Sequence, residues 1–233
     1  FAGIALAVPD VRLMRDFGYA FMLNFSKLDW PTLNQLLCVG GAVLWGLTAT
    51  RLLQDPAKAG TKRRRRDWAR AGVIATTLAI LLPIPYEIVR WAWAAGIPLG
   101  VAHGANLIEG ASGEARAGMF VLGLLPLIGG LLTHGLISRW GERYPSWIPW
   151  KADRRIHPAV VVAPAAAASL MIIAAGLTLI RIELNEWLGR VQQSDPDVTG
   201  WGAWAPGIFW LPWGLALAVA TYAYWRRRRA DGT

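Results

Sequence analysis

Cysteine is nearly absent from this chain, and the sequence motifs of the familiar enzyme classes are missing. Cys38 is the single cysteine among 233 residues, which excludes an internal disulfide and any CxxC redox or zinc pattern. The sequence contains no HExxH helix, no GxxxxGK[ST] loop and no GxSxG elbow. The easily recognised hydrolases and nucleotide-driven motors therefore have no support.

Histidine is also scarce, with three residues in the chain. Two histidines at one depth on neighbouring membrane helices could ligate a haem axially, and His134 and His157 are the candidates. His134 should lie deeper than His157, which begins the next helix, so a hydrogen-bonded packing role is favoured over haem ligation. We predict no cofactor and no metal.

Charge is missing from several long stretches. Runs of about 20 apolar residues without charge match the hydrocarbon thickness of a bilayer and are rare in soluble domains. The runs without Asp, Glu, Lys or Arg are 30–50, 71–86, 117–138, 156–180 and 198–225. Hydrophobic residues make up 55% of the chain, which agrees with a membrane protein.

The basic residues gather in three clusters between these runs: 17 of the 24 lie in 51–70, 139–155 and 226–229. Short loops rich in Lys and Arg stay in the cytoplasm, so all three clusters are expected on that side, together with the C-terminus. The high proportion of Arg, Ala, Gly and Pro is typical of a GC-rich bacterial genome. We therefore predict a multi-pass protein of the bacterial plasma membrane.

These patterns predict an all-α, polytopic transmembrane bundle that forms a single membrane domain over 1–233. The five full helices are expected at about 33–53, 69–95, 117–139, 158–181 and 204–226. Segments 54–68 and 140–157 are predicted to be basic cytoplasmic loops.

The N-terminal segment has a different pattern. Aromatic and Met residues recur at three- and four-residue intervals in 10–32, which favours a helix in the outer interface, with a packed outer loop as the alternative. Because Phe1 is not a translation start and the apolar stretch 1–8 is too short to span, a truncated sixth helix is expected at this start of the chain.

The net charge of +9 raises the question of a partner. The charges lie beside the predicted spans and not on one groove-facing element, so anionic lipid headgroups are favoured and nucleic acid is not. The two tetra-arginine runs carry this prediction: Arg63, Arg64, Arg65 and Arg66, then Arg226, Arg227, Arg228 and Arg229.

The second predicted helix holds the main candidates for chemistry. Pro83 and Pro85 should kink it, because proline removes a backbone donor and clashes with the preceding turn. Glu87 and Arg90 are three residues apart and so share a face, where we predict an intramembrane ion pair. A structural pair is favoured, and a role in a substrate or proton path is the alternative.

Packing can also be predicted from residue type. Small residues between 165 and 176 let helix backbones approach closely, which makes 158–181 the expected central helix. Trp91 and Trp93 fall near a helix end and are predicted to anchor it in the headgroup zone. Trp210 and Trp213 lie deeper and are predicted to pack or to form a lining surface.

Three segments resemble a group of uncharacterised polytopic integral membrane proteins of GC-rich bacteria. They are WPTLNQLLC at 30–38, RWAWAAGIPLG at 90–100 and RWGERYPSW at 139–147. The resemblance implies a multi-helix membrane protein without an assigned activity, and no functional residue can be carried over from it.

Two functions compete on the sequence alone. The favoured prediction is a non-catalytic accessory or scaffold subunit of a membrane assembly, with other membrane subunits or a second copy as partners. The alternative is a small oligomeric transporter or channel built around the kinked second helix, since interrupted helices with nearby charge form transporter sites.

Overall fold

The structure is a computed structural model of the whole chain. It describes residues 62–101, 110–144, 154–189 and 200–230, together with Ile108, Ser146 and nine helical residues between Trp30 and Thr48. Within this part the protein is all-helical and contains no strand. The predicted interfacial segment 10–32 and much of the first predicted span, 33–53, lie outside the described residues.

Four segments are long and apolar enough to cross a membrane: Trp68–Ala94, Gly113–His134, Pro158–Trp187 and Trp201–Arg229. The helices that form them are α4 (Lys62–Leu81), α5 (Ile84–Ala94), α7 (Gly113–His134), α8 (Pro158–Trp187), α9 (Trp201–Trp204) and α10 (Trp210–Ala230), with the 3-10 turn η4 (Ala205–Phe209) between the last two. The four segments correspond to the second to fifth predicted spans.

Local capping explains where the helices begin. The Ser112 side chain accepts a hydrogen bond from Ala115 N at 3.2 Å, so α7 starts four residues before the predicted position 117. His157 caps α8 in the same way, and Pro158 at the first helical position has no N–H to leave unsatisfied. Charged residues at the far end of α8 do not break the helix, which continues past the predicted 181 to Trp187.

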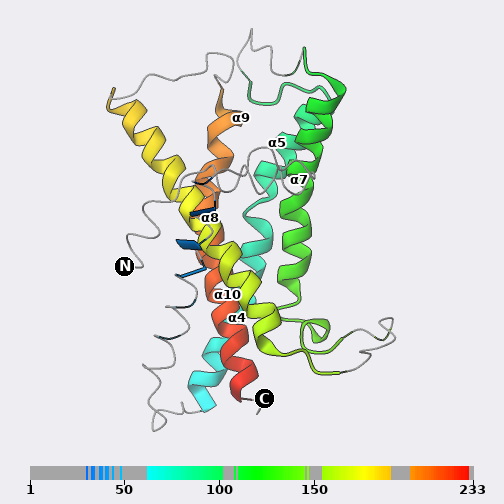
Figure 1. Ribbon diagram of the computed structural model, residues 1–233, viewed down its shortest axis with the longest axis vertical. Helices are drawn as coiled ribbons and strands as arrows, with labels where there is room; N and C mark the ends of the chain where they lie inside the picture. Colours follow the sequence, from blue (N-terminus) through cyan, green and yellow to red (C-terminus); the bar gives the residue numbers. More distant parts are fainter. Residues whose placement is uncertain are drawn as a thin grey trace.

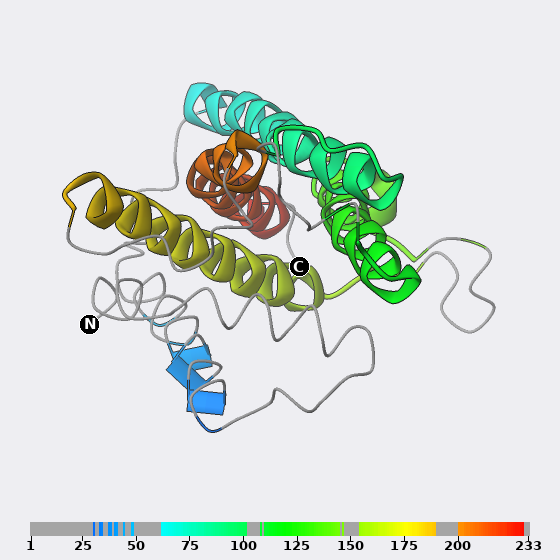
Figure 2. The ribbon, with the colours of Figure 1, turned by 90° about the horizontal axis from the view of Figure 1, so that it is seen from above.

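The centre of the bundle is α10, which packs against α8 on one side and α4 on the other. Figure 2 shows α10 between these two helices, with α7 beside α5. Glycine makes the close approach possible: a Cβ at Gly176 of α8 would lie 2.5 Å from Leu211 N, and one at Gly72 of α4 would lie 2.9 Å from Ala223 Cβ. The small residues of α8 thus contact α10. The sequence had predicted that α8 is the central helix, but α10 holds that place because it packs against both α8 and α4.

The basic segments share one end of the bundle. The start of α4, the connection from α7 to α8 and the end of α10 all lie at the bottom of Figure 1, where the C-terminus is marked. The opposite end holds the α5 to α7 connection and α9. We call these the basic end and the opposite end.

The opposite end is closed by backbone contacts between α9 and the loop after α5. Gly202 N donates to Gly100 O at 2.9 Å, and Gly100 has a φ of 70°, a conformation that favours glycine. Trp93 is 1% exposed and its indole N–H donates to Leu99 O at 2.9 Å. Trp93 is therefore a core residue and not the headgroup anchor that the sequence predicted, because a backbone carbonyl satisfies its N–H inside the protein.

Candidate functional site

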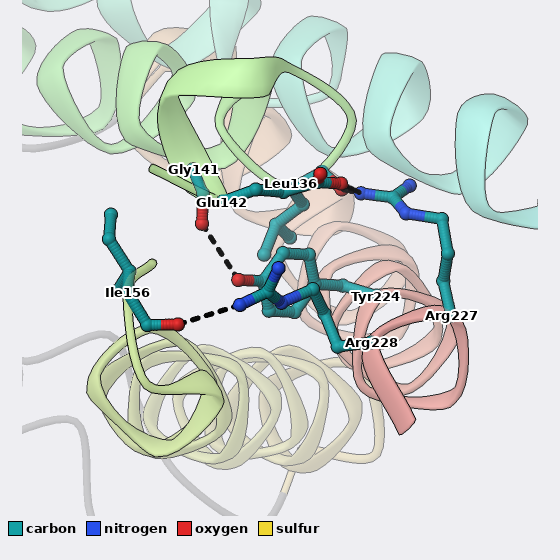
Figure 3. A network of polar contacts seen from close by, with 7 residues as sticks. All are labelled: Leu136, Gly141, Glu142, Ile156, Tyr224, Arg227 and Arg228. Carbon is teal, nitrogen blue, oxygen red and sulfur yellow. Dashed lines mark hydrogen bonds and ion pairs between the residues drawn. The ribbon is translucent and has the colours of Figure 1, made fainter. Parts of the chain in front are cut away.

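The basic end is tied together by polar side chains of α10. Figure 3 shows Tyr224 and Arg228 reaching toward Gly141 and Ile156, near the two ends of the α7 to α8 connection. The Tyr224 hydroxyl donates to Gly141 O at 2.7 Å, and Arg228 donates from an Nη atom to Ile156 O at 2.7 Å. Both side chains are buried. Three parts of the sequence therefore meet here through hydrogen bonds to backbone carbonyls.

Arg227 forms the next part of this network. One Nη atom donates to Leu136 O at 2.8 Å and to Glu142 Oε1 at 2.9 Å, and the second contact is an ion pair. The guanidinium carbon also lies 5.6 Å from the centroid of the Tyr224 ring. Because both residues of the ion pair are about one-third exposed, its electrostatic contribution is modest and its main effect is to fix geometry.

The connection itself is held in an extended pairing. Tyr144 N donates to Arg154 O at 3.0 Å and Ile156 N donates to Glu142 O at 2.9 Å. Before this pairing the chain turns through η2 (Arg139–Gly141), and a Cβ at Gly141 would overlap the carbonyl of Gly135. Only glycine fits at Gly141 without a backbone shift.

The tail arginines differ in their contacts within the protein. Arg227 and Arg228 both donate to protein carbonyls, because the end of α10 packs against the α7 to α8 connection. Headgroup binding by this run stays a prediction. Arg226 lies over the Trp68 ring at 5.3 Å, and Arg229 lies over the Trp225 ring at 4.2 Å. Arg63–Arg66 lie in the first turns of α4, and their side chains are outside the described part.

The second span is broken where the sequence places its two prolines. The α4 helix ends at Leu81 and α5 begins at Ile84, with Pro83 between them and Pro85 in the first turn of α5. Both Tyr86 N and Glu87 N donate to Pro83 O, at 3.0 Å and 3.1 Å. The break is thus a change of hydrogen-bond partner within one continuous span, Trp68–Ala94.

The predicted ion pair at this break is not formed. Within the described residues no ion pair or hydrogen bond joins Glu87 to Arg90. The Arg90 guanidinium lies instead over the rings of Tyr86, at 4.8 Å, and Trp93, at 4.7 Å. Aromatic rings four residues before and three residues after Arg90 bracket its charge by cation–π contacts, and this draws it away from Glu87.

Several buried polar atoms near the break have no hydrogen-bond partner. In the described part these include Arg90 Nε, Trp210 Nε1 and Thr76 Oγ1. Trp210 packs edge-on against Tyr86 with ring centroids 5.5 Å apart, so two of the three atoms are close to the start of α5. Glu87 is only 5% exposed. At the basic end, by contrast, the Tyr224 hydroxyl and an Nη atom of Arg228 do find backbone acceptors, as buried polar groups normally do.

The two histidines considered for haem both have local roles. His134 lies in the last turn of α7, with Nδ1 2.9 Å from Ser138 Oγ, and His157 Nδ1 accepts from Ala159 N at 3.3 Å. Each ring therefore stabilises the end of its own helix. No group of three His, Cys, Asp or Glu side chains within the described ranges is placed to hold a metal ion.

Sequence reasoning missed the residues that join the basic end. Tyr224 and Gly141 are 83 positions apart, and nothing in the local pattern of either one signals the other. Glu142 was visible only as an acidic residue within a basic cluster, which is the one available hint of an ion pair.

Comparison with known proteins adds no further assignment: no family model, curated protein or solved structure matches this chain. The resemblance to uncharacterised membrane proteins stays a prediction.

Proposed function

We propose that this chain is a non-catalytic integral membrane protein that serves as an accessory or scaffold subunit of a membrane assembly. In this proposal it resides in the bacterial plasma membrane with its C-terminus in the cytoplasm, and it binds anionic headgroups together with another membrane subunit or a second copy of itself.

The observation that carries the proposal is the uncovered flank of α7. Only 17% of its most apolar stretch is buried inside the protein, against 39% for Pro158–Trp187 and 44% for Trp68–Ala94. A Cβ at Gly129 would meet nothing within 4 Å, while Leu131 and Leu132 beside it are more than half exposed. A small residue flanked by large apolar ones lets another membrane helix approach closely.

The rigid basic end supports the same proposal. Its polar side chains are directed at carbonyls of the chain itself, as Tyr224 and Arg228 are. Such an arrangement fixes the position of the helices and suits a scaffold better than a site that must exchange ligands.

The test is native mass spectrometry of the intact chain purified from its own membrane in lipid nanodiscs. We expect a mass above that of one chain plus lipid. Gly129→Trp should remove the additional protein mass, whereas Val160→Trp, which places the same bulk on an exposed position of α8, should retain it. A chain that purifies only with lipid, or an equal response of both variants, would contradict the proposal.

A second function, a small oligomeric transporter or channel, is favoured by a different observation. The broken second span carries Glu87, a buried residue that forms no ion pair with the described residues, and interrupted helices near a charged group are how transporters build sites. Flux of small ions into liposomes containing the purified chain tests it. Flux that Glu87→Gln abolishes would favour this function over the scaffold.

A further inference from the structure

Two arginines face each other across the α7 to α8 connection. Arg143 and Arg155 form an isolated antiparallel bridge, and the residues that flank them form the two backbone hydrogen bonds of this pairing. They are therefore a non-hydrogen-bonded pair, the type whose Cα atoms lie about 4.5 Å apart and whose side chains are closest. Like charges directly opposite each other destabilise such a pair. The pairing thus costs free energy unless a negative charge lies beside the two arginines.

The two side chains leave the connection on the side away from α10. Successive side chains of an extended segment point to opposite faces, and residues directly opposite each other share a face. The neighbours of the pair occupy the inner face, since Ile156 is 8% exposed and Glu142 contacts Arg227 of α10. Arg143 and Arg155 are both exposed, as expected for the outer face.

No carboxylate of the described residues neutralises this pair. Glu142, which precedes Arg143, is turned inward and paired with Arg227. Within the described part, neither Arg143 nor Arg155 forms an ion pair or a side-chain hydrogen bond. Each guanidinium has five N–H donors and no acceptor atom, so the outer face of the bridge is a concentrated source of donors and positive charge.

We propose that Arg143 and Arg155 together bind one phosphate group with two negative charges, carried by a lipid headgroup or by a soluble phosphate monoester. A guanidinium donates two parallel hydrogen bonds to phosphate oxygens, and two guanidinium groups on adjacent segments can share one phosphate. A phosphate monoester carries a charge of about −1.5 to −2 at pH 7, which balances the two arginines. A phosphodiester or a carboxylate, with one negative charge, leaves one arginine uncompensated.

The position of the pair is accessible to both sources of the phosphate group. Arg155 lies shortly before α8 begins at Pro158, and Arg143 follows the turn η2 after α7. Both helices are long and apolar enough to span a membrane, so the pair lies beside two predicted spans at the basic end. This inference does not rest on the scaffold function, because the connection alone forms the site.

The first arm of the test concerns lipid. The full chain is placed in phosphatidylcholine micelles with equal minor amounts of phosphatidic acid, a phosphate monoester, and phosphatidylglycerol, a phosphodiester. Native mass spectrometry should show one phosphatidic acid retained in preference to phosphatidylglycerol. Arg143→Gln and Arg155→Gln should each lower this retention about tenfold, the expected result of losing a charge-assisted hydrogen bond.

The second arm uses inorganic phosphate as the probe. The full chain is held in nanodiscs of phosphatidylcholine alone at pH 8, with chloride at equal ionic strength as the reference. Phosphate should raise the melting temperature of the wild type, because it binds the folded chain, and should have no effect on Arg143→Gln or Arg155→Gln. A response in the first arm alone assigns the site to a lipid headgroup, and a response in the second arm alone assigns it to a soluble phosphate monoester. A response in both shows that the phosphate group is sufficient.

Two further variants serve as controls. Arg154→Gln is the matched control, because it removes the same charge from an exposed neighbour of Arg155 on the opposite face, and it should keep both responses. Arg155→Glu protects the test against misfolding. It places opposite charges across the bridge, so the melting temperature without phosphate should rise while the response to phosphate is lost.

Three results would overturn the proposal. One is the absence of a response in both arms. Another is an Arg154→Gln variant that loses as much as Arg155→Gln, because the arginines would then act only through net charge. The third is a response that appears only in Asp153→Asn, because the carboxylate of Asp153, which lies outside the described residues, would then neutralise the pair in the native chain.

Discussion

The basic end and the proline break of the second span differ in the hydrogen bonds that their buried side chains form. At the basic end, Tyr224 and Arg228 each donate to a backbone carbonyl from a distant part of the chain. At the break, Arg90 Nε and Trp210 Nε1 are buried without an acceptor, and Glu87 has no partner among the described residues. The first pattern is typical of contacts that stabilise a fold. The second is typical of functional sites, since an unpaired buried group destabilises the fold.

The comparison also shows why charge alone does not identify function. The largest concentration of Arg lies at the basic end, yet Arg227 and Arg228 there hold the protein together. The break holds a single acidic residue, Glu87, and a charged residue within a membrane span is a candidate for function.

The largest expected difference between the two ends is the side of the membrane on which they lie. The three basic clusters predict that 54–68 lies in the cytoplasm and 182–203 outside. In a Cys38→Ser background, a cysteine at Ser194 should be labelled fully by a membrane-impermeant thiol reagent on intact cells. A cysteine at Thr61 should be labelled only after the cells are opened, and equal labelling of the two on intact cells would reject the topology.

The next effect concerns the backbone contact inside the basic end. Gly141→Ala should lower the free energy of unfolding by about 3 kcal/mol, because the added Cβ meets the Gly135 carbonyl and backbone cannot move aside as a side chain can. Gly113→Ala is the matched control, since a Cβ there meets nothing within 4 Å. Unfolding in mixed micelles measures both. If the two variants unfold alike, the contact between Gly141 and the Gly135 carbonyl is less close than the structure shows.

A smaller effect is expected for the buried arginine. Arg228→Met should cost about 2 kcal/mol, because it removes a charge-assisted hydrogen bond and leaves the Ile156 carbonyl without that donor. Arg229 is the next residue and is exposed. Arg229→Met should lower the free energy of unfolding by less than about 1 kcal/mol, the value of an exposed cation–π contact. The same micelle titration compares them, and a larger loss for Arg229→Met would reverse the roles assigned here.

Much of the span pattern could be predicted from the sequence, because runs without charge and basic clusters respond directly to the bilayer. The prolines of the second span also marked its break, since a missing backbone N–H is a local property. The helix ends shifted by a few residues where a cap such as Ser112 decided them. The first predicted span, 33–53, stays a prediction because much of it lies outside the described residues.

The partners of individual side chains could not be predicted. Spacing correctly indicated that Glu87 and Arg90 share a face, but the choice of Arg90 between a carboxylate and two aromatic rings depends on three-dimensional packing. The prediction for Trp93 was wrong because residue spacing does not describe the turn after α5. This turn places the Leu99 carbonyl where it accepts the indole N–H of Trp93.

The smallest expected effect separates the two tetra-arginine runs. Replacing Arg63–Arg66 by Gln should reduce the anionic lipid that purifies with the protein, since each charge near an anionic surface contributes about 1 kcal/mol at low salt. Arg227→Gln is the control from the other run: its guanidinium contacts Leu136 O and Glu142, so this variant should lose stability and keep its lipid. Lipid mass spectrometry at low and moderate salt measures the first effect, and the mixed-micelle titration measures the second. If Arg227→Gln lost as much lipid as the quadruple variant, the two runs would be equivalent lipid sites, and the contacts of Arg227 within the protein would not govern its role.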